Sequence, residues 1–259
     1  MTGAAVYKLR AENSARLPMI NGRLMHAAFF KILHEVSPEL EQFVHDQLNL
    51  KPFTVSFLDP IAELPSEAGR WEVRRGDQFY WRVTGLNEEI LNAAFSVPVG
   101  YELQAGALIL SVEDVDARIV DLISDVREMS AAAELELKFV TPVSFRIDEF
   151  DAPYPRAELI FSSLADKWIQ AQMPAAVDRK LIRELAAQVR LTEWQGRSKK
   201  FYLSHDRGAL GFWGNFRYSL SALDSDLRKV FMLLAKFAEY AGVGRLCGQG
   251  FGQTRVKFS

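Results

Sequence analysis

The fold is decided by the stretch Asp224–Phe258, which reads DSDLRKVFMLLAKFAEYAGVGRLCGQGFGQTRVKF. Up to Ala241 its apolar and charged residues alternate at helical spacing, which predicts an amphipathic helix. Gly242 ends this helix as a C-terminal cap, and a final strand is predicted from about Gln253 to Phe258. The apolar face of the helix consists of Leu227, Val230, Phe231, Leu234 and Phe237. The stretch therefore predicts a helix, a glycine-rich loop and a strand, in that order.

The residues before this stretch are predicted to form the other strands and helices of the same domain. Their alternation and helical periodicity predict a strand first, then two helices, then further strands. The predicted elements are strand 133–140, helices 155–172 and 177–188, strands 189–192 and 200–203 joined by a basic hairpin turn at 195–200, and strand 212–220.

The first half of the chain shows a similar order. Ser37 followed by Pro38 is typical of an N-cap with proline at the first helical position, which predicts a short helix to about Leu48 that carries His45. The other predicted elements are strand 5–10, a helix after Pro18 that includes residues 24–33, strand 53–58, a hairpin of strands 71–74 and 78–83 around Gly76 and Asp77, helix 86–95, strand 108–112 and a less clear stretch at 117–126.

Both halves thus read strand, helix, strands, helix, strand, which is the ferredoxin-like order. We expect an α+β protein of two tandem ferredoxin-like (RRM-like) βαββαβ domains. The first spans residues 1–131 and carries His45, and the second spans residues 132–259 and contains the glycine-rich loop. No strict sequence repeat accompanies this duplication.

Composition limits the class of protein. With 259 residues, 49% hydrophobic and 25% charged, the chain can bury substantial cores and lacks the charge excess of a disordered protein. The single cysteine, Cys247, excludes an internal disulfide and a thiolate zinc cluster. No stretch reaches the roughly 20 apolar residues of a membrane span, and the segment Met1–Lys8 lacks a hydrophobic signal core. We expect a cytoplasmic protein without a membrane partner, a cofactor or a structural metal.

The charge of the chain is unevenly distributed. The net charge is -2, whereas nucleic-acid binders are usually basic. Acidic residues gather between Glu113 and Glu128, and basic residues gather between Arg179 and Arg217. One face could therefore be positive although the molecule as a whole is not.

The run Gly242–Gly252 contains five glycines, which let the backbone turn sharply and approach a ligand closely. It follows a helix, so it is not a dinucleotide-binding fingerprint, which follows a strand and opens a helix. It is not a P-loop either. On the residues alone, a tight structural connection and a phosphate-contacting loop are about equally probable readings.

The spacing Gly242-x-Gly244, five residues, then Gly250-Phe251-Gly252 resembles the terminal glycine-rich motif of the CRISPR-associated repeat-processing endoribonucleases, in the superfamily of repeat-associated mysterious proteins. Three further stretches are similar to the same family: Ser37–Asp46, Lys51–Ser56 and Gly211–Gly214. The resemblance implies two ferredoxin-like domains that bind CRISPR repeat RNA and cut the precursor once per repeat. It implies attack by the 2′-hydroxyl of the RNA without a metal, which leaves a 5′-hydroxyl and a 2′,3′-cyclic phosphate or 3′-phosphate.

The resemblance also implies roles for particular residues. His45 occupies the place of the catalytic histidine, and Lys51 matches a lysine that supports it. Histidine titrates near neutrality and can transfer protons in either direction, and lysine supplies a fixed positive charge near the phosphorane. Without the resemblance, a lone histidine near a helix end is more often a surface or capping residue.

One position departs from the family pattern. Many relatives carry a tyrosine as a third catalytic group, and the corresponding residue here is Phe30, which cannot transfer a proton. His26 lies four residues earlier, on the same face of the predicted helix, and is the candidate replacement. Because some relatives only hold RNA, the alternative function is that of a non-catalytic RNA-binding subunit of a CRISPR effector complex. A third and weaker alternative is a two-domain protein with a structural glycine loop.

RNA contacts are predicted in the basic hairpin and the glycine loop, because phosphate contacts position the strand. For the hairpin residues, an ordinary solvated surface carries equal weight. Effector-complex proteins and a second copy of the chain are the further partners considered. The predicted RNA-binding residues are Arg197, Lys199, Lys200, Arg207, Arg217, Gly242, Gly244, Arg245, Gly248, Gly250 and Gly252.

Overall fold

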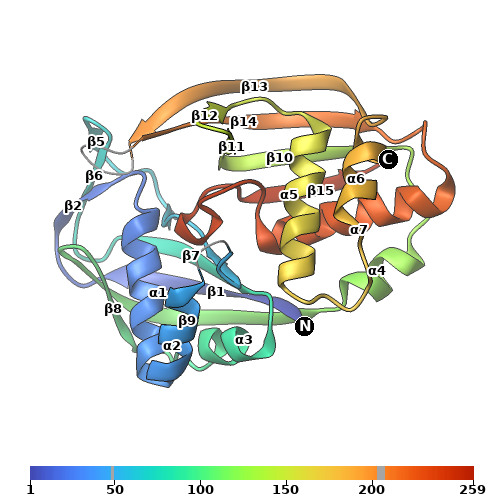
Figure 1. Ribbon diagram of the computed structural model, residues 1–259. Helices are drawn as coiled ribbons and strands as arrows, with labels where there is room; N and C mark the ends of the chain where they lie inside the picture. Colours follow the sequence, from blue (N-terminus) through green and yellow to red (C-terminus); the bar gives the residue numbers. More distant parts are fainter. Residues whose placement is uncertain (48–49, 203–207) are drawn as a thin grey trace. The chain divides into compact units, whose positions relative to one another are not determined.

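A computed structural model describes residues 1–47, 50–202 and 208–259 of the chain (Figure 1). Its internal contacts divide the chain into two compact units. Unit 1 comprises Met1–Val120 together with Gly248–Gly250, and unit 2 comprises Asp121–Cys247 together with Phe251–Ser259.

Unit 1 contains one large antiparallel sheet, with strand order β3-β7-β1-β9-β8 and with β4 also paired to β7. Without the added strands β8 and β4, the order is that of a ferredoxin-like sheet. Helices α1 and α3 pack on strands of this sheet, and α2 lies alongside α1 (Figure 1). The elements are β1 (Thr2–Ala11), β2 (Ala15–Pro18), α1 (Gly22–Val36), α2 (Pro38–Asp46), β3 (Phe53–Val55), β4 (Asp59–Pro60), β5 (Ser66–Glu67), β6 (Arg70–Val73), β7 (Gln78–Gly85), α3 (Glu88–Phe95), β8 (Glu102–Ala105) and β9 (Leu108–Val120).

Alternating burial along β1 explains how this sheet holds its helices. Ala5, Tyr7 and Leu9 are fully buried, and the ring of Tyr7 stacks on Trp81 of the paired strand at 5.1 Å between centroids. The Tyr7 hydroxyl donates a hydrogen bond to the Ala94 carbonyl of α3. Large aromatic side chains, each removing much apolar surface from water, therefore form the core of unit 1.

The predicted hairpin of residues 71–74 and 78–83 is wrong. β6 pairs with β2 and β5 in a separate three-stranded sheet, whereas β7 lies in the large sheet. The turn itself forms, because Asp77 N donates to Arg74 O and Gly76 adopts a positive φ of 95°. A local turn signal was present, but β6 pairs with β2 and with β5, which directly precedes it, and not with β7, which follows the turn.

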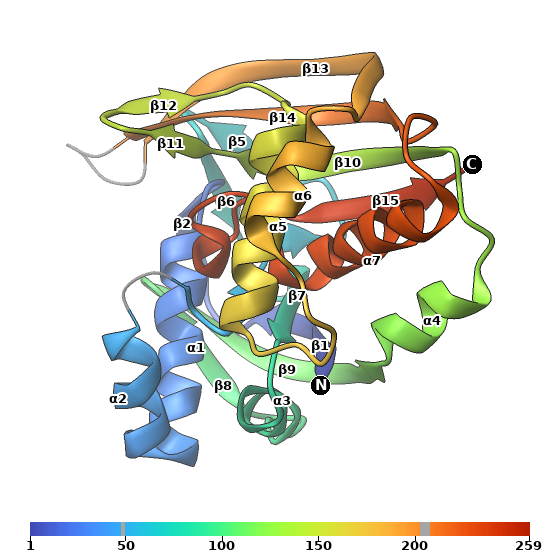
Figure 2. The same cartoon turned by 45° about the vertical axis from the view of Figure 1, so that its right-hand side comes forward.

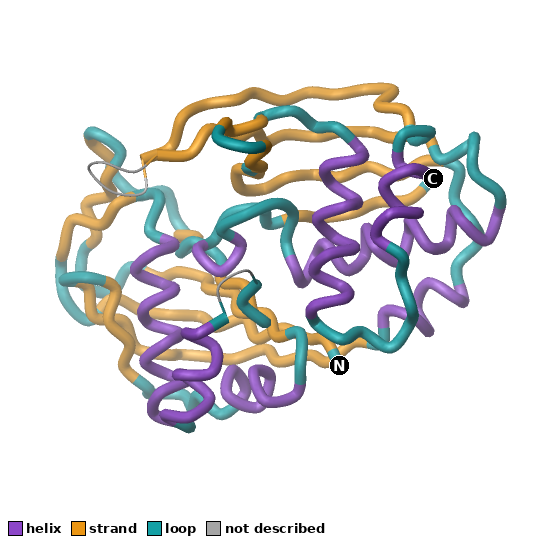
Figure 3. The backbone as a smooth tube through the Cα atoms, in the orientation of Figure 1, coloured by secondary structure: helices purple, strands orange, loops and turns teal. Residues whose placement is uncertain are grey.

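Unit 2 repeats the ferredoxin-like order, with an antiparallel sheet β13-β14-β10-β15. Helices α5 and α7 pack together, α6 lies beside α5, and α7 runs along β15 (Figure 2). Figure 3 shows the same backbone with helices in purple, strands in orange and loops in teal. The elements are α4 (Leu122–Glu128), β10 (Glu134–Val143), β11 (Phe145–Ile147), β12 (Phe150–Ala152), α5 (Ala157–Gln170), α6 (Arg179–Ala186), β13 (Arg190–Tyr202), β14 (Gly208–Ser219), α7 (Ser225–Ala241), the short 3₁₀ helix η1 (Cys247–Gln249) and β15 (Thr254–Phe258). The two tandem ferredoxin-like folds predicted from the sequence are confirmed.

The predicted hairpin turn at residues 195–200 is also wrong, because β13 continues through it from Arg190 to Tyr202. Gly196 pairs with Gly214 inside the ladder. A Cβ at Gly196 would lie 2.7 Å from the ring of Phe216 and 2.8 Å from the Trp213 carbonyl. This glycine is thus explained by the close approach of a neighbouring strand. Arg197, Lys199 and Lys200 lie on a strand and not on a turn.

By contacts, the two units divide between Val120 and Asp121. Asp121 caps α4 by accepting hydrogen bonds from the backbone of Ile123 and Ser124, and α4 packs against α7. The domain boundary between residues 131 and 132 stays a prediction.

Candidate active site

His45 is presented by the last turn of α2. Ser37 begins this helix as its N-cap, because its Oγ accepts a hydrogen bond from Leu40 N at 3.1 Å, and Pro38 occupies the first turn. The side chain of His45 is 68% exposed, and its Nδ1 lies 3.6 Å from Oδ1 of Asp46. The N-cap predicted from the sequence is confirmed, and it sets where the helix begins and hence where His45 falls.

Lys51 holds the C-terminal end of the same helix. Its Nζ donates to the carbonyls of Val44 at 2.7 Å, His45 at 2.8 Å and Gln47 at 2.8 Å. The last carbonyls of a helix lack partners within the helix, and a cation is favourable at that end. Partial burial lowers the pKa of Lys51, while the nearby Asp46 carboxylate acts in the opposite direction. Lys51 therefore fixes the backbone that carries His45.

Phe30 of α1 is the common neighbour of the candidate catalytic groups. Its ring centroid lies 4.7 Å from that of His26 and 6.2 Å, edge-on, from that of His45. Lys51 Nζ lies 5.9 Å from the same centroid, and Phe53 packs on the ring from β3 at 5.8 Å. The three residues predicted to take part in cleavage are thus brought together around one aromatic side chain.

His26 is held by the glycine loop. Its Nδ1 lies 2.7 Å from the Gly248 carbonyl oxygen, which can only accept, so Nδ1 carries the hydrogen. The neutral ring then has an unprotonated Nε2. Burial lowers the pKa of His26, and the charges of Lys51, Arg23 and His45 lower it further, against the opposing effect of the Gly248 hydrogen bond. His26 is therefore neutral near neutral pH and suited to accept a proton.

Within unit 1, Gln249 and Gly250 lie so close to Gly22 and Phe57 that neither glycine can be replaced by a larger residue without a shift. A Cβ at Gly22 would lie 1.8 Å from the Gln249 carbonyl oxygen, and a Cβ at Gly250 would lie 2.4 Å from the ring of Phe57. Gly250 also has a positive φ of 85°. Gly22 was not singled out from the sequence, because its partner lies more than two hundred residues away.

The remaining glycines of the loop shape the end of α7 in unit 2. Gly242, Gly244 and Gly252 have positive φ values of 63°, 76° and 69°. The buried Lys167 donates to the carbonyls of Ala241 at 2.9 Å and Gly242 at 2.8 Å, and its Nζ lies 3.0 Å from Cys247 Sγ. These contacts give the glycines a structural role, and their contact with RNA stays a prediction.

The predicted RNA-binding cations differ in how far their charge is already engaged. Arg245 forms an ion pair with Asp151 and donates to Ser144 Oγ at 3.0 Å. Arg217 is paired with Glu193 at 2.7 Å and Glu136 at 3.5 Å. Both arginines therefore have acidic partners that an RNA phosphate would have to displace.

Three other cations complete the predicted set. Arg197 lies over the ring of Trp213, 4.7 Å from its centroid, and Lys200 lies 5.5 Å from the centroid of Tyr202. Lys199 is exposed on the same strand, and Arg207 lies outside the described residues. Arg197 on Trp213 is the arrangement best suited to a nucleic acid, since it offers a cation and an aromatic face together.

In residues 1–47, 50–202 and 208–259, no group of three His, Cys, Asp or Glu side chains could hold a metal ion. No helix in that part of the chain has the length and apolar character required to cross a membrane.

Two family models match the sequence. Residues 1–97 match the CRISPR Cas6 N-terminal domain, and residues 137–254 match the CRISPR-associated endoribonuclease Cas6. Proteins from two strains of Mycobacterium tuberculosis, both named CRISPR-associated endoribonuclease Cas6, are 27% identical over 188 residues, which cover 68% of this chain. The match spans 58% of the length of these relatives.

Solved structures with similar folds cover almost the whole chain. A Cas6 product complex is 25% identical, with a TM-score of 0.78 over 99% of this chain and 100% of the other. Thermus thermophilus Cas6 is 24% identical, with a TM-score of 0.70 over 99% and 98% of the two chains. A protein from a Cas6-related gene of Pyrococcus furiosus shares the fold, with 15% identity and a TM-score of 0.65 over 99% of each chain.

Proposed function

The chain belongs to the Cas6 family of CRISPR-associated endoribonucleases, and on that premise we propose that it cuts CRISPR precursor RNA within its repeats. The observation that carries this proposal is the cluster of His26, His45 and Lys51 around the ring of Phe30. The matching family model is described as an endoribonuclease, which supports RNA as the substrate.

The proposed reaction is a transesterification that needs no metal ion. The 2′-oxygen of the RNA attacks the adjacent phosphorus, and the bond from phosphorus to the 5′-oxygen breaks. One group must remove the proton of the 2′-hydroxyl, and another must protonate the leaving 5′-oxygen. The products are a 2′,3′-cyclic phosphate, or the 3′-phosphate formed when it hydrolyses, and a 5′-hydroxyl.

The surroundings of the two histidines suggest a division of these roles. His26 is neutral, with Nε2 unprotonated and its tautomer fixed by the Gly248 carbonyl, so we assign it as the base. His45 is exposed and lies edge-on to the same Phe30 ring, so we assign it the remaining role, that of the acid. Each proton transfer is worth roughly 10²- to 10⁴-fold in rate.

Lys51 has a positioning role in this scheme. All three of its hydrogen bonds go to carbonyls at the end of α2, and these bonds orient the turn that carries His45. Its positive charge remains beside the cluster, where it also favours the developing charge of the phosphorane.

The RNA track in this proposal runs over basic residues of unit 2. Arg197 with Trp213 offers a phosphate contact and a stacking face, and Lys199 and Lys200 on the same strand extend the positive charge. Cations that neutralise phosphates make binding dependent on salt. Effector-complex proteins and a second copy of the chain remain predicted partners.

Phe30 favours a second candidate, that of a non-catalytic RNA-binding subunit of an effector complex. Phenylalanine lacks the hydroxyl that the tyrosine of many relatives provides, so the chain would bind repeats without cutting them. The two candidates differ in whether His45 has chemistry to perform.

Cleavage of labelled repeat RNA in excess EDTA distinguishes them. We expect the wild-type protein to cut, and His45→Ala to cut about 10²- to 10⁴-fold more slowly while still binding the RNA. His34→Ala is the matched control, because His34 is an exposed histidine of unit 1 whose Nδ1 lies 3.9 Å from Glu41 Oε2. Binding without cleavage by the wild type would favour the second candidate. Equal cleavage by His45→Ala would show that the assignment is wrong.

A further inference from the structure

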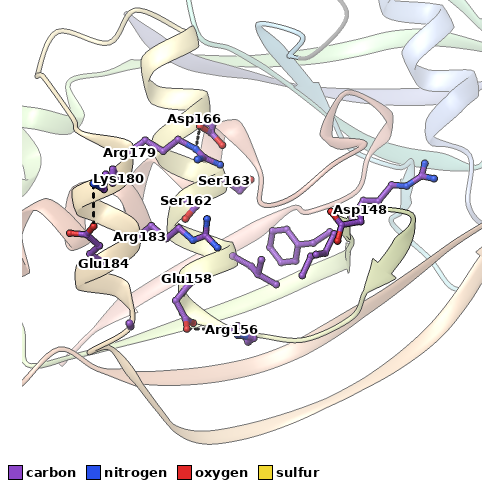
Figure 4. Close-up of a pocket in the computed structure, with 15 residues that line it drawn as sticks. Asp148, Arg156, Glu158, Ser162, Ser163, Asp166, Arg179, Lys180, Arg183 and Glu184 are labelled. Atoms are coloured by element: carbon purple, nitrogen blue, oxygen red, sulfur yellow. Dashed lines mark hydrogen bonds and ion pairs between the residues drawn. The ribbon is translucent and has the colours of Figure 1, made fainter.

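A cavity of about 940 Å³ lies in unit 2, away from the histidine cluster in sequence (Figure 4). It is lined by α5 from its N-cap Arg156 to Asp166, by one face of α6 and by β11 with the residue that follows it. This volume is within the range of small-molecule sites in proteins, about 300–1,000 Å³.

Most of the charged side chains around the cavity are already paired with one another. Arg179 Nε lies 2.5 Å from Asp166 Oδ1, and Arg156 lies 2.9 Å from Glu158. Lys180 lies 4.0 Å from Glu184 (Figure 4). These pairs leave little net charge, so the cavity is not a simple basic patch.

Among the basic residues that line the cavity, Arg183 is the exception. It forms no ion pair at salt-bridge distance with any residue that the structure describes, although its charge helps to lower the pKa of Glu158. Figure 4 shows its guanidinium extending from α6 between Ser162 and Glu158. A planar guanidinium with free donors is the group that binds phosphate most specifically.

Ser162 supplies the second observation. Only 8% of this residue is exposed, and its Oγ has no hydrogen-bond partner among the described residues. An unpartnered buried hydroxyl is destabilising, and buried polar groups without a partner are uncommon in folded proteins. A phosphate oxygen bound by Arg183 would give this hydroxyl an acceptor once the flexible arginine side chain moves onto the anion.

Three larger apolar residues also line the cavity, beside the polar residues Arg146, Asp148 and Ser163. Phe145 is buried, Leu159 is half-buried, and Ile147 is 43% exposed on β11. An inorganic anion would make no favourable contact with apolar side chains. A nucleotide has a base that can pack against them while its phosphate binds the cation.

We propose that this cavity binds a nucleotide, with the phosphate on Arg183 and the Ser162 hydroxyl and the base against Ile147 and Leu159. The nucleotide is either free in solution or part of a single-stranded RNA. The site does not depend on the cleavage chemistry proposed above, because none of its residues belongs to the His26 and His45 cluster.

The test is calorimetric titration of the full-length protein with adenosine 5′-monophosphate, with a ten-nucleotide single-stranded RNA and with inorganic phosphate. We expect Arg183→Ala to weaken mononucleotide binding at least tenfold, since hydrogen bonds to charged groups contribute about 1.5–3 kcal/mol. Arg190→Ala is the matched control, because Arg190 is an exposed arginine of unit 2 that does not line the cavity. Its affinity should stay within about twofold of wild type.

Ser162→Ala tests whether the Ser162 hydroxyl binds the ligand or only contributes to stability. Because the variant removes an unpartnered hydroxyl, its Tm without ligand should equal or exceed that of the wild type, while the rise in Tm caused by the mononucleotide should shrink. If the wild type binds the mononucleotide and Arg183→Ala weakens that binding, the ligand is a free nucleotide. If only the RNA binds, and Arg183→Ala weakens that binding, the ligand is a strand. The proposal would be overturned if neither the mononucleotide nor the RNA binds, or if wild type and Arg183→Ala bind them equally well. Cleavage of repeat RNA by the same variants reports separately on the proposed function.

Discussion

At the scale of single residues, the two histidines of the cluster differ in their surroundings. His26 is largely buried and bound to a carbonyl, whereas His45 is exposed beside a carboxylate. Both face the ring of Phe30, which can pack against them but cannot exchange a proton. The chemistry proposed here therefore depends on two groups in place of the histidine and tyrosine of many relatives.

The lowered pKa of His26 predicts the pH dependence of cleavage. As a base, His26 must be unprotonated, and it gains a proton only when the pH falls below the ordinary histidine pKa of about 6.5. The rate should therefore hold from neutral pH to below 6.5 and fall at lower pH. Single-turnover rates measured from pH 5 to 9 check this, and His26→Ala should lose both the rate and this acid limb. An unchanged profile in His26→Ala would remove it from the reaction.

At the scale of elements, the C-terminal turn of α2 is stabilised from outside the helix. Lys51 donates hydrogen bonds to three carbonyls of this turn. Lys51→Met should therefore lower the free energy of unfolding by about 1–3 kcal/mol. It should also lower kcat by a larger factor than it raises KM. Lys51→Arg keeps a cation and donors at this position and should recover part of both losses. Denaturant unfolding and steady-state kinetics measure the two effects. A rise in KM with kcat unchanged would show that Lys51 binds substrate and does not position His45.

The segment Gly248–Gly250 is the second element on which the site depends. Gly250→Ala would place a Cβ 2.4 Å from the ring of Phe57, so the segment must shift and the Gly248 carbonyl would leave His26. We expect cleavage to slow at least tenfold. Gly76→Ala is the matched control, because Gly76 also has a positive φ but a Cβ there meets nothing within 4 Å. It should cost only the backbone strain, about 1 kcal/mol, and leave cleavage unchanged. Equal slowing in both variants would point to lost stability instead.

The elements show what sequence alone can predict. Local signals sufficed where the cause is local: Ser37 caps α2, Gly242 ends α7, and the apolar periodicity of α7 matches its buried face. Pairing failed where the partner is not the strand that the local signal suggests. β6 joins β2 and β5, and Gly196 accommodates the ring of Phe216 inside a strand.

At the scale of the whole molecule, the same strand order occurs in both units although no sequence repeat accompanies it. Alternation and helical periodicity were enough to predict this duplication, because each unit buries one face of its sheet under helices. The contact of His26 with Gly248 joins residues 222 positions apart. No local pattern contains that information, so the cluster could be proposed from the sequence only through family resemblance.

The central claim is that the RNA supplies its own nucleophile. The most direct test uses the wild-type protein in excess EDTA with a repeat RNA that carries one 2′-deoxynucleotide on the 5′ side of the cut. The account predicts that this RNA binds as tightly as the unmodified repeat but is not cut, while the unmodified repeat yields a 5′-hydroxyl and a 2′,3′-cyclic phosphate or 3′-phosphate. Cleavage of the deoxy substrate at a comparable rate would contradict it.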